Sequence, residues 1–412
     1  MDQRVFETYE SEVRSYCRNF PTVFTHAKGS IMTDQDGRAF IDFFNGAGAL
    51  NYGHNPDFIK SRLIDYLASD AVIHALDMYT ATKAEFIQTF ETKMLIPRGL
   101  NYKMQFTGPT GTNGVEAAIK LARKVTKRTN IIALMGGFHG MTLGSLSLSS
   151  DLSSRAGAGV PLGNVTHVPA PYQFGEDFAL QYLETILTDD HSGVDAPAAI
   201  ILETVQAEGG IYVLSDDYLR GVERIARAHG VLLIIDDVQV GCSRTGHFFS
   251  FERAGISPDL VVMSKSIGGY GLPFALVLLK PELDLWSPGE HNGTFRGNQL
   301  AMVAATAGVE ITLEQGIEAG VDRRGKLVAD FLAERIPADR AEVRGLGLIW
   351  GVDVHDTDTA TRIGRACFDR GLILERAGRN NSVVKIMPSL VIPDETLLEG
   401  LGILADCVSE QL

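Results

Sequence analysis

A lysine and an aspartate each stand where a strongly apolar run of the sequence ends. Asp236 ends the run in "VLLIIDD" (231–237), and Lys265 ends "DLVVMSK" (259–265). A lysine removed from water has a lowered pKa and becomes a nucleophilic amine, and a carboxylate in such a place needs a cationic partner. The two residues predict an amine that can form a Schiff base and a carboxylate that can hold a protonated ring nitrogen. A helix dipole or an arginine is the alternative partner for Asp236.

Two glycine-rich segments carry groups that could bind the rest of a flat, phosphorylated cofactor. In "MQFTGPTGTNGVEAAIK" (104–120), a strand is followed by a loop and a helix, so the first helical amides and the hydroxyls of Thr110 and Thr112 could hold a phosphate. A plain helix cap is the alternative. In "GGFHG" (136–140), Phe138 could stack on a ring, but taken alone the segment is better explained by a core aromatic residue beside a surface His139.

Taken together, these residues indicate one kind of cofactor more strongly than any of them does alone. Gln239 follows Asp236 closely and can hydrogen-bond a phenolic oxygen on the ring that Asp236 would hold. A lysine for a Schiff base, a carboxylate for a pyridinium nitrogen, a phosphate-binding loop and a stacking ring are what pyridoxal 5'-phosphate requires. No single feature is specific for this cofactor, but the combination in this order predicts it.

Such residues converge only if a sheet brings the ends of its strands to one edge. The middle of the chain alternates strand-like and helix-like segments, which indicates a largely parallel sheet covered on both faces, with ligands bound at the carboxyl ends of the strands. The expected strands are 130–137, 198–205, 231–237, 259–265 and 274–280, and the expected helices are 114–127 and 216–230.

The two ends of the chain differ from the middle. A hairpin is expected around Asp36 and Gly37 within 29–44, a strand pair within 341–354 and a short strand within 383–392. We expect residues 1–60 and 311–412 to form a small domain together, and residues 61–310 to form a large cofactor-binding domain.

Composition excludes several classes of protein. The 412 residues carry a net charge of -14, which argues against a general nucleic-acid binder. The sequence has no long uncharged apolar stretch, so no membrane-spanning helix is expected. The charged N-terminal segment is unlike a signal peptide. The four scattered cysteines have no metal-ligand spacing, so a cytoplasmic protein with free thiols and no metal site is expected.

The segment "DDVQVGCSRTGHFFSFERAGISPDLVVMSKSIGGYGLP" (236–273) resembles the long signature of the class III (subgroup II) aminotransferases. The segments "TGTNGVEAAIKLAR", "GGFHGMTLGSL", "ETVQAEGG", "GTFRGNQLA" and "VRGLGLIWGV" are similar to further motifs of that family, and the resemblance runs over nearly the whole chain. It implies PLP fold type I, an α/β architecture in which a large domain with a mainly parallel seven-stranded sheet is joined to a small α+β domain built from both termini.

The resemblance also implies roles for individual residues. Lys265 would bind the cofactor covalently and move the proton, and Asp236 would keep the pyridine nitrogen protonated. The remaining cofactor contacts that it implies are the phosphate groups Gly111 and Thr112, the ring-stacking Phe138 and Val238, the ring-oxygen ligand Gln239, and the site residues His139 and Glu203. Thr294 would reach the phosphate from the neighbouring subunit, which makes a homodimer the smallest active unit.

Three residues are expected to contact the substrate. Many members of the family bind a carboxylate through an arginine that a glutamate masks; here Lys385 occupies the arginine position, and Glu208 would be its partner. Lysine lacks the bidentate fork of arginine, so carboxylate binding there should be looser. Arg296 stands where a glycine is common and is a candidate carboxylate anchor, with pairing to a surface acid as the alternative.

Within the family, stretches up to about residue 310 resemble the enzymes that supply ectoine synthesis. These enzymes move the amino group of L-glutamate to L-aspartate 4-semialdehyde, which gives 2-oxoglutarate and L-2,4-diaminobutyrate. A transaminase for another ω-amino acid, such as 4-aminobutyrate or ornithine, is the first alternative. A protein that binds the cofactor without turnover is the second.

Overall fold

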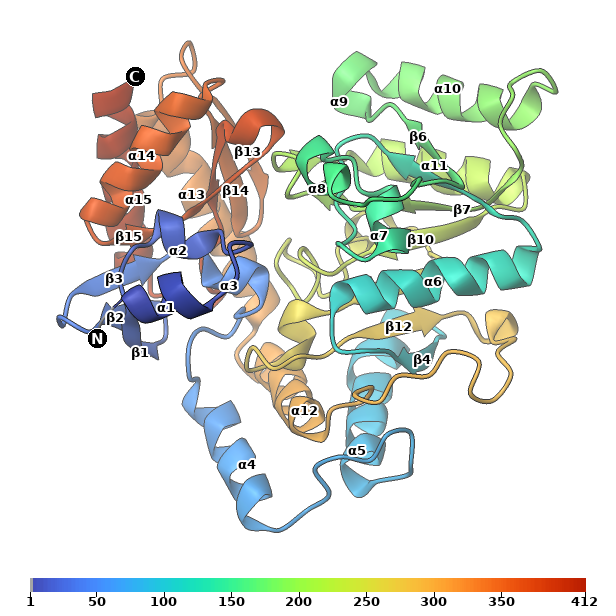
Figure 1. The fold of residues 1–412 in the computed structure, drawn as a ribbon, viewed down its shortest axis with the longest axis horizontal. Coiled ribbons are helices and arrows are strands. Elements are labelled where there is room, and N and C mark those ends of the chain that lie inside the picture. The colour runs from blue at the N-terminus through green and yellow to red at the C-terminus, as the bar shows by residue number, and fades with distance from the viewer. Residues whose placement is uncertain (1–2) are drawn as a thin grey trace.

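The computed structural model describes residues 3–412, so the first two residues of the predicted segment 1–60 lie outside the described part of the chain. Figure 1 shows two parts side by side. The larger part, mostly green and yellow, contains a wide sheet between layers of helices. The smaller part, at the left, combines blue segments from the beginning of the chain with orange and red segments from its end.

The larger part is built on a seven-stranded sheet with the order β4-β12-β11-β10-β7-β5-β6. In chain order its strands are β4 (Lys103–Phe106), β5 (Asn130–Leu134), β6 (Val165–Val168), β7 (Pro197–Leu202), β10 (Leu232–Asp236), β11 (Leu260–Met263) and β12 (Leu276–Leu279). All neighbouring strands pair in parallel except that β12 runs antiparallel to β11 and to β4. The predicted seven-stranded, mainly parallel sheet is therefore confirmed.

Helices cover both faces of this sheet. The main ones are α6 (Gly111–Thr126), α7 (Leu143–Leu148), α10 (Glu176–Thr188) and α11 (Asp216–Ala228). Alternate residues of one strand enter different cores: Ile131 packs with α6, whereas Ile132 packs in the core that includes α11. Because both faces are buried, these strands read as continuous apolar runs in the sequence.

The smaller part contains two four-stranded sheets. One has the order β1-β2-β3-β15, and the other has the order β13-β14-β17-β16. Their strands are β1 (Phe24–Lys28), β2 (Ile31–Asp34), β3 (Ala39–Asp42), β13 (Glu342–Leu346), β14 (Ile349–Asp353), β15 (Leu372–Ile373), β16 (Glu375–Ala377) and β17 (Val383–Ile386). Helices α13 (Ile317–Arg335), α14 (Thr357–Asp369) and α15 (Asp394–Gln411) pack on them. The predicted hairpin at Asp36 and Gly37 and the predicted strand pair in 341–354 are both present.

Helix α12 (Gln299–Glu314) joins the two parts. Ala301 and Met302 belong to the core of the larger part, and Ala304 and Ile311 belong to the core of the smaller part. Helices α4 (Asp57–Ala68) and α5 (Ala81–Phe90) pack against α12 at the lower edge of Figure 1. Boundaries near residues 60 and 310 stay a prediction, since α12 contributes side chains to both cores.

The chain around Lys265 is held from two sides. Ser266 donates a hydrogen bond from its hydroxyl to the carbonyl of Gly48 at 2.6 Å, which ties the lysine loop to the N-terminal segment. On the other side, Gly269 (φ +70°) lies against α12, where a Cβ atom would come within 2.2 Å of the carbonyl oxygen of Ala304. Only glycine allows this approach, so the loop after Lys265 is closely packed.

Some elements end earlier than the sequence predicts. The strand expected over 259–265 stops at Met263, and Lys265 itself has a left-handed backbone conformation (φ +54°). This conformation is uncommon for a residue with a side chain, and such residues cluster at functional sites. The strand expected within 383–392 stops at Ile386, just before Pro388, which has no amide hydrogen to donate to a sheet.

Candidate active site

A cavity of about 330 Å³ lies at the carboxyl ends of the central strands. All of the predicted site residues line it except Thr294, Arg296 and Lys385. The sheet explains this convergence: the strands β5, β7, β10 and β11 are parallel, so the residues that follow them meet at one edge. Ala49 and Phe274, for which the sequence predicts no contact with a ligand, also line the cavity, together with Gly271, Leu272 and Pro273.

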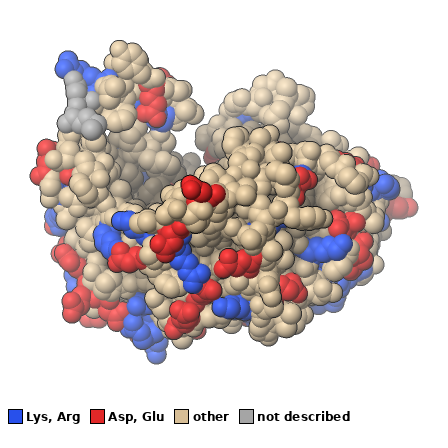
Figure 2. Space-filling model, turned by 90° about the horizontal axis from the view of Figure 1, so that it is seen from below, with Lys and Arg blue, Asp and Glu red and all other residues tan. Residues whose placement is uncertain are grey.

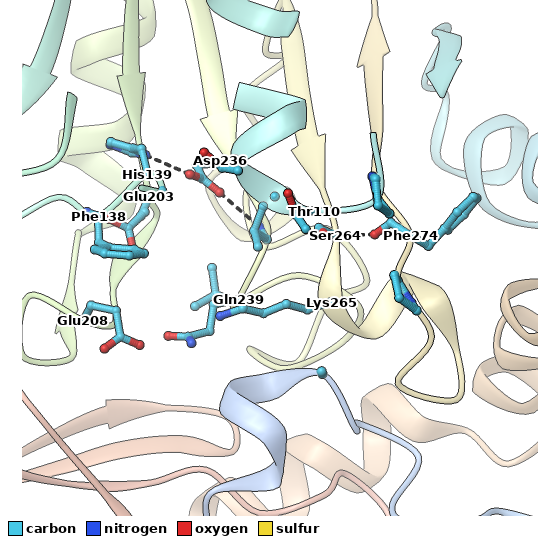
Figure 3. A pocket seen from close by; sticks show the side chains of 18 of the residues that line it. Thr110, Phe138, His139, Glu203, Glu208, Asp236, Gln239, Ser264, Lys265 and Phe274 are labelled. Carbon is cyan, nitrogen blue, oxygen red and sulfur yellow. Dashed lines mark hydrogen bonds and ion pairs between the residues drawn. The ribbon is translucent and has the colours of Figure 1, made fainter. Parts of the chain in front are cut away.

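Asp236 and His139 form a buried pair, as Figure 3 shows. The His139 Nδ1 atom donates to Asp236 Oδ2 at 2.8 Å, and the amide of Val238 donates to Asp236 Oδ1 at 3.2 Å. Burial alone would lower the pKa of His139, but its hydrogen bond with Asp236 and the charge of that carboxylate raise the pKa above the usual value. The alternative of a surface His139 is wrong, because this side chain is buried and lines the cavity.

Glu203 lies behind Phe138. The backbone amide of Phe138 donates to Glu203 Oε1 at 2.9 Å, so the glutamate positions the segment that carries the aromatic ring. Burial raises the pKa of Glu203 to about 7. Its carboxyl group therefore exchanges its proton near neutral pH, beside the charged pair of His139 and Asp236.

The first turn of α6 faces the cavity with Thr110, Gly111 and Thr112. The side chain of Thr110 makes no capping hydrogen bond, so the plain helix-cap alternative does not describe this helix start. Helix amides and the positive end of the helix dipole favour an anion there. A Cβ atom at Gly111 would lie 3.0 Å from Val238 Cγ1, so glycine keeps the space between the helix start and Val238 open.

Lys265 projects into the cavity next to Gln239 (Figure 3). Within residues 3–412, no carboxylate lies within ion-pair distance of its amine. Burial lowers the pKa of Lys265, whereas the nearby charge of Glu208 raises it by less than burial lowers it. A larger fraction of this amine is therefore neutral and nucleophilic than for a lysine in water.

Lys385 lies behind the cavity wall and is completely buried. Its ammonium group contacts Glu208 Oε1 at 2.6 Å, Glu375 Oε2 at 3.0 Å and Gln239 Oε1 at 3.3 Å. The contact with Glu208 agrees with the partner expected from the sequence. Glu375 was missed, because only the pairing of β16 with β17 places it opposite Lys385.

Arg296 and Thr294 lie away from this cavity. The Arg296 guanidinium pairs with Asp77, and Arg296 lines a separate hollow that includes Lys83 and Trp286. This pairing matches the surface-acid alternative, although it leaves the predicted substrate role untested. Thr294 is exposed, so within this single chain it contacts none of the cavity.

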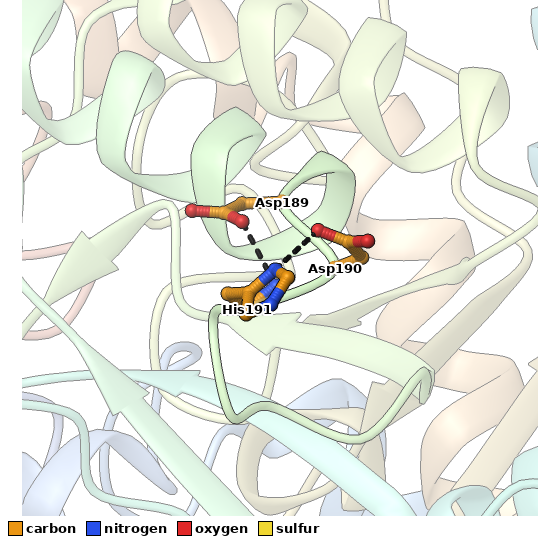
Figure 4. A group of neighbouring side chains, drawn as sticks. All are labelled: Asp189, Asp190 and His191. Atoms are coloured by element: carbon orange, nitrogen blue, oxygen red, sulfur yellow. Dashed lines mark hydrogen bonds and ion pairs between the residues drawn. The ribbon is translucent and has the colours of Figure 1, made fainter.

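A further group of titratable side chains, Asp189, Asp190 and His191, lies elsewhere (Figure 4). The His191 Nδ1 atom bonds to Asp190 at 2.7 Å, and both side chains are 89% exposed, so their ion pair contributes little to stability. The three residues precede β7 and therefore lie at the opposite edge of the sheet from the cavity. They form a solvated surface cluster that is separate from the active site.

Asp237, next to Asp236 in the sequence, has a carboxyl group whose pKa is shifted by its surroundings. It is buried, its Oδ2 accepts a hydrogen bond from the amide of Ser250 at 3.2 Å, and its Oδ1 has no partner among the described residues. Burial raises its pKa from 3.8 to about 7. The folded state therefore holds a proton that the unfolded chain has lost, and stability falls as the pH rises from about 4 to 7.

We expect Asp237→Asn to remove this loss of stability, since the amide cannot ionise. The free energy of unfolding of the variant, relative to that of the unmodified protein, should rise by about 2 kcal/mol when the pH is changed from 5 to 8. Urea unfolding of both proteins at the two pH values measures the gain, and Asp217→Asn, at an exposed position, is the control. If the two proteins differed by the same free energy of unfolding at both pH values, the raised pKa of Asp237 would be contradicted.

Known proteins are similar to this chain over nearly its whole length. Residues 13–408 match the family "Aminotransferase class-III". A diaminobutyrate–2-oxoglutarate transaminase of Halalkalibacterium halodurans is 51% identical over 411 residues, which cover 99% of this chain and 96% of the relative. The enzyme of that name from Nocardia farcinica is 51% identical over 412 residues, which cover 99% and 94%.

Solved structures share the fold at low sequence identity. An aminotransferase of Bacillus anthracis has a TM-score of 0.89 at 22% identity and covers 99% of this chain and 97% of its own. The ornithine aminotransferase of Toxoplasma gondii, whose structure has partial occupancy of PLP at the active site, has a TM-score of 0.86 at 23% identity and covers 99% and 93%. The fold type I architecture is thus confirmed. From the family match over nearly the whole sequence, we conclude that this chain is an enzyme that belongs to the class III aminotransferases.

Proposed function

We propose that this enzyme transfers the amino group of L-glutamate to the aldehyde carbon of L-aspartate 4-semialdehyde, which gives 2-oxoglutarate and L-2,4-diaminobutyrate. The observation that carries the proposal is the identity of about one half, along nearly the whole chain, with relatives named diaminobutyrate–2-oxoglutarate transaminase. Service in ectoine synthesis and a cytoplasmic location stay predictions. No helix within residues 3–412 combines the length and apolar character that a membrane crossing needs.

The cavity fits pyridoxal 5'-phosphate as cofactor. An amine with a lowered pKa, a buried carboxylate, an uncapped helix start and an aromatic side chain face one space, and each matches one part of that molecule. When bound, the cofactor supplies an electron sink that stabilises negative charge at the carbon that carries the amino group. We propose that Gly111 and Thr112 hold the phosphate and that Phe138 and Val238 enclose the ring.

Asp236 and its neighbours would keep the ring nitrogen protonated. The carboxylate is fixed by His139 and by the amide of Val238, so its position does not depend on a ligand. Gln239 donates a hydrogen bond from its amide to the carbonyl of Ala47 at 2.9 Å, and in our proposal it also reaches the phenolic oxygen of the ring. A preorganised carboxylate of this kind requires no rearrangement when the charge develops.

Lys265 has two tasks in this proposal. Its amine would hold the cofactor covalently, and when the substrate is bound the free amine would carry the proton of the 1,3-shift, taking it from the substrate carbon that bears the amino group. The lowered pKa increases the neutral fraction of the amine, which is the form that acts as a general base. The left-handed backbone at Lys265 places the side chain at the end of β11 and inside the cavity.

We propose a homodimer as the smallest active unit, with Thr294 reaching the phosphate of the neighbouring subunit. Thr294 and Phe295 are exposed, and Phe295 lies against His74 with ring centroids 5.5 Å apart. The segment that contains His74 also has exposed apolar side chains, namely Val72, Ile73, Leu76, Met78 and Tyr79. Figure 2 views the molecule from below and shows wide areas without charged side chains between scattered acidic and basic groups, which is compatible with an interface.

A substrate panel tests the proposed function. The purified enzyme, loaded with the cofactor, is supplied with L-glutamate and with aspartate 4-semialdehyde, succinate semialdehyde or glutamate 5-semialdehyde, and 2-oxoglutarate is measured. The proposal expects aspartate 4-semialdehyde to have the largest kcat/KM. A larger value for either of the other aldehydes would identify a 4-aminobutyrate or an ornithine enzyme, and cofactor binding without spectral change on adding glutamate would indicate a protein without turnover.

A further inference from the structure

Lys385 has two carboxylate partners of different kinds. Glu375 lies directly opposite Lys385 in the antiparallel pair of β16 and β17, so the register of the sheet fixes their contact. Glu208 arrives from the other part of the molecule, on the connection between β8 (Val205–Gln206) and β9 (Tyr212–Val213). The register of the sheet fixes the first ion pair, whereas the second depends on the conformation of the Glu208 side chain, since the backbone carbonyl of Glu208 is held by the amide of Gly378 at 2.9 Å.

The two carboxylates also face different surroundings. Glu208 lines the cavity, and its side chain is 30% exposed. Glu375 is not among the lining residues, its side chain is only 10% exposed, and its second oxygen accepts a hydrogen bond from the hydroxyl of Tyr16 at 2.9 Å. Tyr16, from α2 (Tyr16–Asn19), therefore donates to the remaining oxygen of Glu375, so each oxygen of this carboxylate has a protein partner.

The charges of the cluster decide what it attracts. Burial would lower the pKa of Lys385, but Glu208 and Glu375 raise it above its usual value, and the charges of Lys385 and Lys265 lower the pKa of Glu208 although burial would raise it. The lysine is thus charged between two carboxylates. A substrate carboxylate that displaced Glu208 would meet a lysine that Glu375 has already neutralised, whereas a substrate ammonium would meet an accessible Glu208 carboxylate.

We propose that Glu375 is a specificity-determining residue: it retains Lys385 in a cross-strand ion pair, so that Glu208 binds an ammonium group at the far end of the substrate and a far end with a carboxylate alone is disfavoured. This inference rests on the proposed function for the identity of the substrate. With carbon 4 at the reacting centre, L-2,4-diaminobutyrate presents its α-ammonium group beside its carboxylate at the far end, and 4-aminobutyrate presents a carboxylate alone. The cluster therefore distinguishes the two by charge.

The experiment compares the cofactor-loaded enzyme with its Glu375→Gln variant. The first measurement is the ratio of kcat/KM for L-2,4-diaminobutyrate to kcat/KM for 4-aminobutyrate, with 2-oxoglutarate as acceptor. The second is the dissociation constant of glutarate, an unreactive dicarboxylate, by calorimetry. In the variant, Lys385 has only Glu208 as carboxylate partner, so we expect the ratio to fall about tenfold and glutarate to bind about tenfold more tightly.

Two single variants serve as controls. Glu342→Gln removes a carboxylate from β13 of the same sheet, where the side chain is exposed, and Tyr16→Phe removes the hydrogen bond but keeps the charge of Glu375. Both should leave the ratio within about twofold of the unmodified enzyme. An unchanged ratio or an unchanged glutarate constant in a folded Glu375→Gln variant would overturn the proposal.

A double variant keeps the proposal testable if Glu375→Gln does not fold. Glu375→Gln combined with Lys385→Met removes both members of the cross-strand pair and leaves Glu208 as the charged group. The preference for L-2,4-diaminobutyrate should then be at least that of the unmodified enzyme, whereas a lost preference would show that Lys385 binds the substrate. If the unmodified enzyme rejects L-2,4-diaminobutyrate, the proposed function fails, and the glutarate measurement still decides the role of Glu375.

Discussion

Replacement of Lys265 by alanine is expected to lower kcat for transamination by at least about a thousandfold. The side chain is the one amine that lines the described cavity, and burial lowers its pKa. Without this amine, no side chain would attach the cofactor covalently, and no group would carry the proton of the 1,3-shift. Alanine leaves the backbone of the loop unchanged, so the fold should persist in circular dichroism and in thermal unfolding.

Covalent trapping of the cofactor and the turnover rate both test the role of Lys265, with one control variant. Borohydride reduction followed by mass spectrometry should add the cofactor to the unmodified enzyme and not to the Lys265→Ala variant. Lys280→Ala is the matched control, because Lys280 follows the neighbouring strand β12 but pairs with Asp259 at 2.7 Å outside the cavity. Turnover within tenfold of the unmodified enzyme in the Lys265 variant would refute the assigned role.

Replacement of Asp236 by asparagine is expected to lower kcat by about a hundredfold to a thousandfold. The amide has almost the same shape as the carboxylate but no charge, so it cannot keep a ring nitrogen protonated. It also leaves the buried His139 without its ion pair, although the amide of Val238 can still donate to the remaining oxygen. Steady-state kinetics with L-glutamate and 2-oxoglutarate measure the loss.

The variant His139→Gln separates the two effects of Asp236→Asn. Glutamine can donate a hydrogen bond to Asp236, so the carboxylate keeps its charge while the imidazole is lost. We expect this variant to lose at most about tenfold in kcat, because it changes only the partner that positions the acid. If both variants lost the same factor, the charge of Asp236 would not be the property on which the reaction depends.

The strands and the cavity residues could be predicted because each signal is local. Continuous apolar runs such as 231–236 indicate strands that are buried on both faces, and the structure has β10 there. Polar residues at the ends of such runs then indicate one common edge. The N-terminal limit of α6 was placed three residues late, at Gly114 instead of Gly111, because the glycine and threonine residues of its first turn resemble a loop.

The partners of the charged residues could not be predicted in the same way. His139 and Asp236 are 97 residues apart, Glu208 and Lys385 are 177 apart, and Asp77 and Arg296 are 219 apart. Glu375 is only 10 residues from Lys385, but the register of β16 against β17 makes them neighbours. A short segment of sequence contains no information about such contacts.

The sequence by itself therefore determined the class of fold and the family, because these depend on local runs and on the order of motifs, and it predicted which residues would bind a phosphorylated ring cofactor. Only the tertiary structure decided that Lys385 is buried between two carboxylates, that His139 supports Asp236 and that Arg296 faces Asp77 outside the cavity. The physical reason is that charged side chains interact over a few ångströms, and strand register and domain packing decide which of them come that close.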